Sequence, residues 1–127
     1  MSRNVIISGD FDCINSRHLH LIKEAKKQAI PNGRVVILLF ADYTKFLLDK
    51  IFPIQTVGLR KKNLEYFIKS VDIVDVDTSD YEGFLDNKLN SFKDFLYIHY
   101  ETDKEFVGRS AMKKHGIQVK FIKEPKI

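Results

Sequence analysis

A chain of 127 residues fits a single domain, and an apolar share of 44% with an aromatic share of 12% supports an ordinary core and argues against disorder. One cysteine, Cys13, excludes an internal disulfide framework and a cysteine-based zinc cluster, which favours a reducing, cytoplasmic compartment. The net charge of +4 favours anionic small molecules; the C-terminal lysines do not interleave with aromatic residues, so nucleic acid is not an expected partner.

Short apolar runs alternate with longer amphipathic segments along the chain. The pattern predicts, in chain order, a strand at residues 5–8, a helix that ends before 31–33, a strand at 33–40, a helix at 58–69, a strand at 71–76, a helix at 81–92, a strand at 95–99, a helix at 104–115 and a strand at 117–122. The first apolar run is too short for a membrane span or a signal peptide, so no membrane partner is expected.

Strands that alternate with helices favour right-handed crossovers and a parallel sheet. We therefore predict one α/β domain over residues 1–127, with a Rossmann-like five-stranded parallel sheet and helices on both faces.

The turn between the first strand and the first helix is the candidate site, because ligands of open parallel sheets bind at the carboxyl ends of the strands. Gly9 at the strand end lets the backbone approach a ligand closely. Arg17 and His18 stand in the first turn of the helix, where the helix dipole disfavours cations and where free N–H groups attract phosphate. A bound anion there would offset that cost.

Four residues of this turn, Gly9, Phe11, Asp12 and His18, carry a resemblance. They match, at the correct spacing, the signature G-T-F-D-x-x-H-x-G-H of the cytidylyltransferase-like nucleotidyltransferases, as in the glycerol-3-phosphate cytidylyltransferase type. A second stretch over residues 59–74, with Arg60, resembles another family motif that leads into the third strand. The likeness in fold and order extends from about residue 4 to residue 122.

The resemblance implies transfer of a nucleotidyl group from a nucleoside triphosphate, CTP in preference to ATP, to a small phosphorylated acceptor, with Mg²⁺ accompanying the triphosphate. In this reaction a substrate phosphate attacks the α-phosphate and pyrophosphate leaves, so the protein mainly positions and stabilises charge. His18 and Asn15 take the catalytic positions, and no side chain is assigned as a metal ligand. The nucleotide-binding positions fall on Ser8, Gly9, Asp10, Phe11, Asp12, Arg17, Lys50 and Arg60.

Three positions of the signature depart from the family. Asp10 stands in place of a hydroxyl residue, Asn15 in place of the first histidine and Arg17 in place of a glycine. No counterpart of the family's I-S-T-T segment follows the fifth strand. Since the loss of one transition-state donor costs about 10²–10³ in rate, these departures predict impaired activity.

Two alternatives stay open at the level of sequence. The chain is either an enzyme or a catalytically inactive relative that binds a nucleotide or a partner protein. A receiver-like module is a weaker alternative, with Asp10 and Asp12 as its acidic pair and Asp75 or Asp77 as its phosphorylated residue.

Outside the signature, we expect the Lys45 side chain to be solvated. For Lys50, a solvated side chain and one that binds the triphosphate are equally favoured. His99 ends a strand at the ligand edge, where a buried or edge polar residue is the favoured interpretation. Family members often form homodimers, which makes the region of residues 71–72 a candidate contact.

Overall fold

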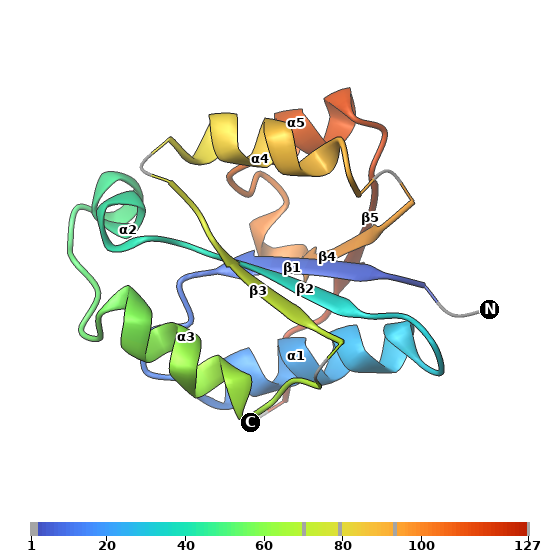
Figure 1. The fold of residues 1–127 in the computed structure, drawn as a ribbon, viewed down its shortest axis with the longest axis horizontal. Helices are drawn as coiled ribbons and strands as arrows, with labels where there is room; N and C mark the ends of the chain where they lie inside the picture. Colours follow the sequence, from blue (N-terminus) through green and yellow to red (C-terminus); the bar gives the residue numbers. More distant parts are fainter. Residues whose placement is uncertain (1–2, 70, 79, 93, 127) are drawn as a thin grey trace.

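A five-stranded parallel sheet in the order β3-β2-β1-β4-β5 forms the centre of the chain in the computed structural model, which describes residues 3–69, 71–78, 80–92 and 94–126 (Figure 1). The strands are β1 (Val5–Gly9), β2 (Val35–Leu39), β3 (Ile73–Val76), β4 (Leu96–Tyr100) and β5 (Gln118–Ile122). The helices are α1 (Ser16–Ala29), α2 (Asp42–Asp49), α3 (Val57–Glu65), α4 (Tyr81–Leu89) and α5 (Arg109–Lys114), with a 3₁₀ turn at Glu101–Asp103. Residue 70 of the second motif and the chain ends at 1–2 and 127, within the predicted domain, lie outside the described residues.

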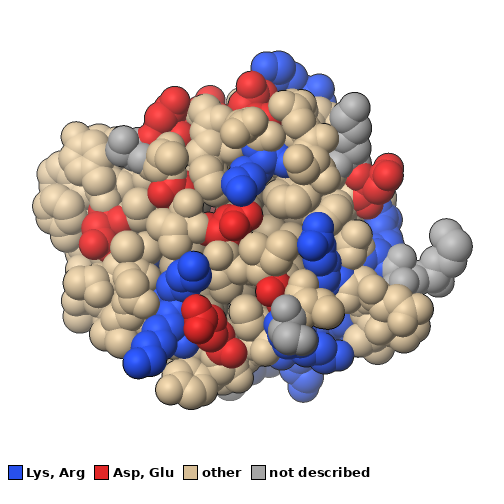
Figure 2. Space-filling model, viewed as in Figure 1, with Lys and Arg blue, Asp and Glu red and all other residues tan. Residues whose placement is uncertain are grey.

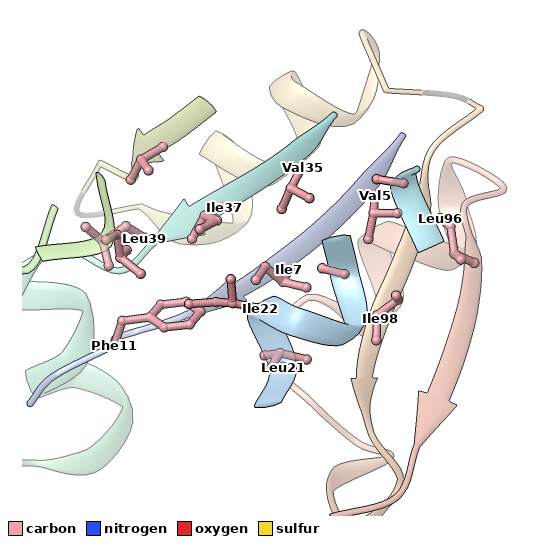
Figure 3. Close-up of a cluster of buried hydrophobic side chains, with 14 of the residues drawn as sticks. Val5, Ile7, Phe11, Leu21, Ile22, Val35, Ile37, Leu39, Leu96 and Ile98 are labelled. Carbon is pink, nitrogen blue, oxygen red and sulfur yellow. The ribbon is translucent and has the colours of Figure 1, made fainter. Parts of the chain in front are cut away.

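Helices cover both faces of the sheet, as predicted: α1 and α3 lie on one face and α4 and α5 on the other (Figure 1). Because side chains of a strand alternate between faces, Val5 and Ile7 pack in one apolar cluster with α1 and α3, whereas Ile6 packs in a second cluster with α4 and α5. Figure 3 shows the first cluster, where Leu21 and Ile22 of α1 face the strands. Two buried faces explain why the strands read as continuous apolar runs.

The helix α2 was not predicted, and it lies beyond the carboxyl edge of the sheet rather than on a face (Figure 1). Asp77, at the end of β3, caps its N-terminus: the Asp77 carboxylate accepts from Ala41 N at 2.6 Å and from the Thr44 hydroxyl at 2.8 Å. Burial raises the pKa of Asp77, although these hydrogen bonds act in the opposite direction. A tertiary cap of this kind leaves no local signal in the sequence.

The predicted helix at residues 104–115 was wrong in its first half. The chain forms a 3₁₀ turn and a loop before α5 begins at Arg109. Gly108 has φ +96°, a conformation that side chains rarely adopt, and it breaks the helical path. Within the described residues, no helix is long and apolar enough to cross a membrane.

Candidate functional site

A cleft opens between the carboxyl ends of β1 and β4, where the strand order reverses direction. β1 pairs with β2 along its whole length, from Val5 to Gly9, but it pairs with β4 through Val5 and Ile6. The two strands therefore separate toward their carboxyl ends. Crevices at such a switch point are where open α/β sheets bind ligands.

The cleft has a volume of about 310 Å³. Six of the predicted site residues line it, and these are Ser8, Gly9, Asp10, Phe11, Arg17 and His18. Its remaining lining comes from Leu21, Phe40, Asp49, His99, Tyr100 and Asp103. Of the other predicted residues, Asn15, Asp12, Lys50 and Arg60 do not line it.

A larger depression of about 470 Å³ lies between α3 and β3, with Lys61, Lys69 and Asp72 in its lining. It is at the amino edge of the sheet, since the Asp72 carboxylate accepts from Val35 N at the start of β2, 2.8 Å away. We take the smaller cleft as the candidate site because it combines the carboxyl edge with the predicted residues.

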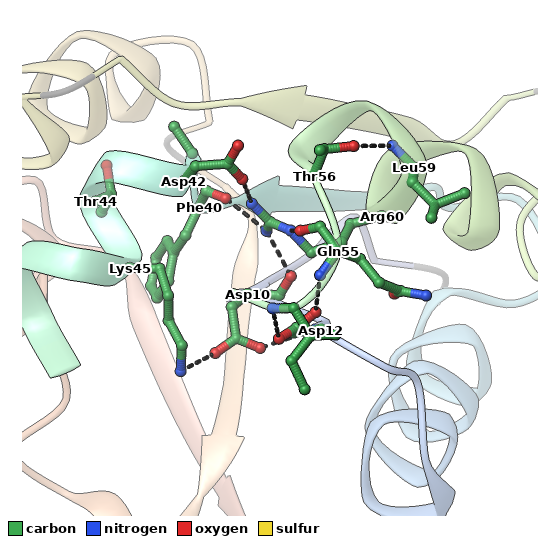
Figure 4. Close-up of polar contacts among 12 residues, drawn as sticks. Asp10, Asp12, Phe40, Asp42, Thr44, Lys45, Gln55, Thr56, Leu59 and Arg60 are labelled. Atoms are coloured by element: carbon green, nitrogen blue, oxygen red, sulfur yellow. Dashed lines mark hydrogen bonds and ion pairs between the residues drawn. The ribbon is translucent and has the colours of Figure 1, made fainter. Parts of the chain in front are cut away.

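Arg60 is wholly buried, and it holds the turn after β1 instead of facing a ligand (Figure 4). Its Nη1 donates to the carbonyls of Asp10 and Phe40, each at 2.7 Å, and its Nε donates to the carbonyl of Gln55 at 3.0 Å. Its Nη2 donates to the Asp42 carboxylate at 2.6 Å. The prediction that Arg60 neutralises a triphosphate is therefore corrected: the guanidinium joins β1, β2 and the segment before α3.

Asp12 makes a second connection from the same turn (Figure 4). Its carboxylate accepts from Ile54 N at 2.7 Å and from Gln55 N at 2.9 Å, and the Gln55 side chain in turn accepts from Cys13 N at 3.1 Å. Phe11 and Cys13 both have positive φ, at +47° and +50°, a backbone conformation that residues other than glycine rarely adopt. The hydrogen bonds of Asp12 and Gln55 therefore stabilise this turn. The structure thus gives Asp12 a structural role and places it away from the cleft lining.

The departure at Asp10 is balanced by a lysine. Lys45 Nζ lies 2.7 Å from the Asp10 carboxylate (Figure 4). It also pairs with Asp49, which lines the cleft. Burial alone would raise the pKa of Asp10, but hydrogen bonds from Lys45 and from Asp12 N outweigh it and lower that pKa. Lys45 is thus held at the loop, contrary to the prediction that it is solvated. Lys50, with φ +65°, ends α2 and is exposed.

Asn15 and His18 form a reciprocal cap at the start of α1. The Asn15 side chain accepts from Arg17 N at 3.0 Å and from His18 N at 3.2 Å. In return, Asn15 N donates to His18 Nδ1 at 3.1 Å. Asn15 is therefore a helix cap through its side-chain oxygen, and its predicted role as a donor to phosphate, which would use the side-chain nitrogen, stays a prediction.

That cap also selects the tautomer of His18. Because Nδ1 accepts a hydrogen bond, the neutral ring carries its proton on Nε2, which can donate to an anion in the cleft. The ring lies 5.4 Å from the ring of Phe11. Burial lowers the pKa of His18, with the nearby Arg17 and Lys45 charges acting in the same direction and Asp10 and Asp12 against it. The neutral form is thus favoured near pH 7.

Arg17 reaches the cleft but is already engaged by a carboxylate. Its Nε and Nη2 donate to the two Glu124 oxygens at 2.8 and 2.9 Å, and its guanidinium lies 4.3 Å from the centre of the Tyr100 ring. The hydrogen bond from Arg17 lowers the pKa of Glu124, and burial raises the pKa of Tyr100 to about 12. The Thr102 hydroxyl also donates to Glu124 at 2.6 Å, so the chain after β5 is joined to α1 and to the end of β4.

A chain of polar groups runs from the end of β1 to the far wall of the cleft. The hydroxyls of Ser8 and Tyr97 lie 2.6 Å apart, and Tyr97 Oη lies 3.4 Å from His99 Nδ1. His99 Nε2 lies 3.0 Å from the Asp103 carboxylate. His99 is thus at the ligand edge, half-buried and oriented by partners on both ring nitrogens.

The lining residues that sequence reasoning did not assign come from several elements. Phe40 follows β2, Tyr100 ends β4, and Asp49 ends the unpredicted helix α2. For Phe40 and Tyr100, the position at the end of a predicted strand was the available signal. Of the two candidates for phosphorylation in a receiver-like module, Asp77 is buried with both carboxylate oxygens bonded, which argues against its modification, and Asp75 pairs with Lys88 at 3.3 Å.

Comparison with known proteins gives relatives of the same fold. The chain is 24% identical over 128 residues to a FAD synthase of Korarchaeum cryptofilum (strain OPF8), covering 99% of this chain and 84% of the relative. It is also similar to the solved structure of the lipopolysaccharide core biosynthesis protein from Thermoplasma volcanium GSS1, with a TM-score of 0.72, 22% identity and coverage of 100% and 99% of the two chains. A macrolide-efflux protein from Streptococcus pneumoniae matches with a TM-score of 0.60 and 18% identity, over 96% of this chain and 53% of that one.

The likeness to a FAD synthase supports a nucleotidyltransferase-like family. The solved structure from Thermoplasma volcanium confirms the predicted Rossmann-like α/β fold, since it shares this fold along its full length. No family model matches the chain.

Proposed function

We propose that this chain is a nucleotidyltransferase that transfers a nucleotidyl group from a nucleoside triphosphate to a small phosphorylated acceptor in the cleft between β1 and β4. The observation that carries the proposal is the placement of His18. It lies at the start of α1, lines the cleft, and keeps Nε2–H as its free donor. A neutral donor beside a helix N-terminus suits the oxygens of a triphosphate.

The reaction needs no protein nucleophile. An oxygen of the acceptor phosphate attacks the α-phosphorus, the bond to the bridging oxygen breaks, and pyrophosphate leaves. His18 Nε2–H and the Arg17 guanidinium are the groups of the cleft that can stabilise the growing negative charge. Lys45, held between Asp10 and Asp49, is a further cation beside the same space.

Mg²⁺ belongs to this proposal as a companion of the triphosphate. Asp10 and Asp49 line the cleft, but both carboxylates already pair with the same side chain, Lys45. The described part of the chain contains no group of three or more His, Cys, Asp or Glu side chains arranged for a metal. We therefore assign the ion to the substrate complex, where phosphate oxygens and water supply its ligands.

The donor and acceptor are proposed from the relatives. The signature resemblance favours CTP, whereas the FAD synthase relative favours ATP, since FAD carries an adenylyl group on a flavin phosphate. We propose ATP as the donor and take a flavin mononucleotide and glycerol 3-phosphate as the two acceptors to compare.

A second candidate function is nucleotide binding without turnover. The specific observation in its favour is that two groups of the signature are engaged within the protein: Asn15 caps α1, and Glu124 holds Arg17. Turnover would then be slow even where a nucleotide binds well.

Thermal unfolding with ATP, CTP, GTP and UTP, each with and without Mg²⁺, tests binding first. A ligand at 100 times its Kd adds about 2.7 kcal/mol to native stability, which such a measurement resolves readily. Pyrophosphate release with each acceptor then tests turnover. His18→Gln should weaken both signals, with His115→Gln as the control because His115 is bonded to Asp86 at a site distant from the cleft. A shift without pyrophosphate release supports the binding function, and no shift with any nucleotide refutes both.

The pH profile gives a further test of the role of His18. Its folded-state pKa lies below the ordinary 6.5, so the unfolded chain binds the proton more readily and native stability rises with pH through that range. Protonation of Nδ1 also removes the acceptor for Asn15 N. It keeps the Nε2–H donor, however, and adds a positive charge beside the anion, so nucleotide affinity should rise as the pH drops through the lowered pKa, and His18→Gln should flatten that dependence.

A further inference from the structure

Large apolar side chains are exposed together on α2 and on the segment that follows it. They are Tyr43, Leu47, Leu48, Ile51, Phe52 and Ile54, with exposed fractions between 41% and 86%. We call this set the apolar patch. Phe46 joins its aromatic members, since the Phe46 ring stacks on Phe52 at 4.6 Å and lies 6.2 Å from Tyr43. In Figure 2 the surface over α2 and the loop toward α3, at the left of the view, carries few charged side chains.

The size of the apolar patch is unusual for a free surface. With ~200 Å² for a fully exposed large apolar side chain, its members expose about 700 Å². The largest apolar patch on a typical monomer covers about 300–600 Å². A standard protein–protein interface buries about 800 Å² on each partner. The patch therefore has the area that one side of a stable interface needs.

The charges at the border of the patch suit a second copy of the same surface. Asp42 begins α2 and Asp49 ends it, and their carboxylates pair within the chain with Arg60 and with Lys45. The two aspartate side chains are still 41% and 50% exposed, and Lys50 follows directly and is also exposed. A twofold axis through the patch brings the same surface against itself, so that a lysine of one copy meets an aspartate of the other while apolar side chains meet in the centre. Both signs of charge on one border make this surface self-complementary.

We propose that a second copy of this chain covers the apolar patch, so that two copies associate through α2 and residues 50–54. The proposal does not rest on the function proposed for the cleft, but Asp49, which lines the cleft, also lies at the border of the patch and places the interface beside the mouth of the cleft. It also differs from the contact at residues 71–72 that the family resemblance suggested.

Sedimentation over a wide range of protein concentrations tests this proposal. We expect the wild-type chain to dimerise, and Ile51→Glu or Ile54→Glu to raise the dimer dissociation constant by about thirtyfold or more, since buried charges oppose association. Two separate variants guard against misfolding, and circular dichroism reports the fold of each. Both side chains are exposed, so neither change removes a core contact.

Ile30→Glu is the matched control, because the exposed fraction of Ile30, 58%, is close to the 62% of Ile51. Ile30 follows α1 at the opposite edge of the sheet, away from the apolar patch. It should leave the dimer intact. Val71→Glu tests the alternative contact. A wild-type chain that stays monomeric at every concentration overturns the proposal. So does a dimer that Val71→Glu or Ile30→Glu dissociates and Ile51→Glu does not.

Discussion

Replacement of Arg60 by methionine separates the structural role of this residue from the ligand role that its motif suggested. Methionine keeps an unbranched apolar stem of similar reach, but it removes the four hydrogen bonds that the guanidinium donates. The Phe40 carbonyl, whose bond to Arg60 is fully buried, then has no donor. An unsatisfied buried acceptor costs about 1–3 kcal/mol. The Asp42 carboxylate is 41% exposed, so water partly replaces its lost partner and the ion pair adds less than a fully buried pair would.

We therefore expect Arg60→Met to lower the free energy of unfolding by about 3 kcal/mol, a large share of the 5–15 kcal/mol typical of a domain. Arg60→Lys keeps the charge but cannot donate along three directions in one plane, so we expect a loss of about 2 kcal/mol. Urea unfolding followed by circular dichroism measures both changes, because the chain has no tryptophan to report by fluorescence.

Nucleotide binding of the folded fraction completes this test. Arg60→Lys should bind ATP within about twofold of the wild-type affinity at a temperature where it is fully folded, because Arg60 does not line the cleft. If Arg60→Lys lowered the free energy of unfolding by less than about 1 kcal/mol and yet no longer bound nucleotide, that result would refute the reasoning. It would mean that the guanidinium contacts the ligand, as the family motif implied.

Three smaller predictions address the other positions of the site. Lys45→Met should weaken ATP binding by about tenfold or more in calorimetry, whereas Lys50→Met should weaken it by less than about twofold. The reason is that only Lys45 is held beside the cleft, so equal effects of the two changes would contradict this prediction. Asn15→Ala should cost about 1 kcal/mol in urea unfolding as a lost helix cap, whereas Asn15→Asp should cost less. Glu124→Gln frees Arg17 and should tighten pyrophosphate binding by up to about fivefold at low salt, the scale of a half-exposed ion pair; weaker binding would show that Glu124 orients Arg17 productively.

The strands and the covered faces of the sheet could be predicted from sequence because they depend on local patterns. A buried parallel strand is a continuous apolar run, and each of the five runs became a strand within a few residues of its predicted bounds. The helix α2 could not be found in the same way. Three of its four apolar side chains, Tyr43, Leu47 and Leu48, are exposed, and the carboxylate at its N-terminus comes from Asp77, directly after β3.

The candidate site was predictable in place but not in the roles of its residues. The signature led to the turn after β1, and Gly9, Phe11 and His18 do line the cleft there. Whether a charged side chain faces the cleft or the protein depends on partners distant in sequence. Arg60 satisfies carbonyls of two strand ends, and Lys45 compensates Asp10 across 35 positions of the chain, so a motif alone could not distinguish these roles.

The carboxylate of Asp12 joins the turn that lines the cleft to the backbone at Ile54, inside the apolar patch. A nucleotide that shifts the turn therefore also shifts one edge of the surface on which two copies would meet. Coupling free energies are reciprocal, so the factor by which nucleotide changes self-association equals the factor by which self-association changes nucleotide affinity. Apparent affinity then depends on protein concentration, and Asp12→Asn, which weakens the link while leaving both surfaces in place, should reduce that dependence. A single hydrogen-bonded side chain would in this way make the abundance of the protein itself an effector of its own ligand binding.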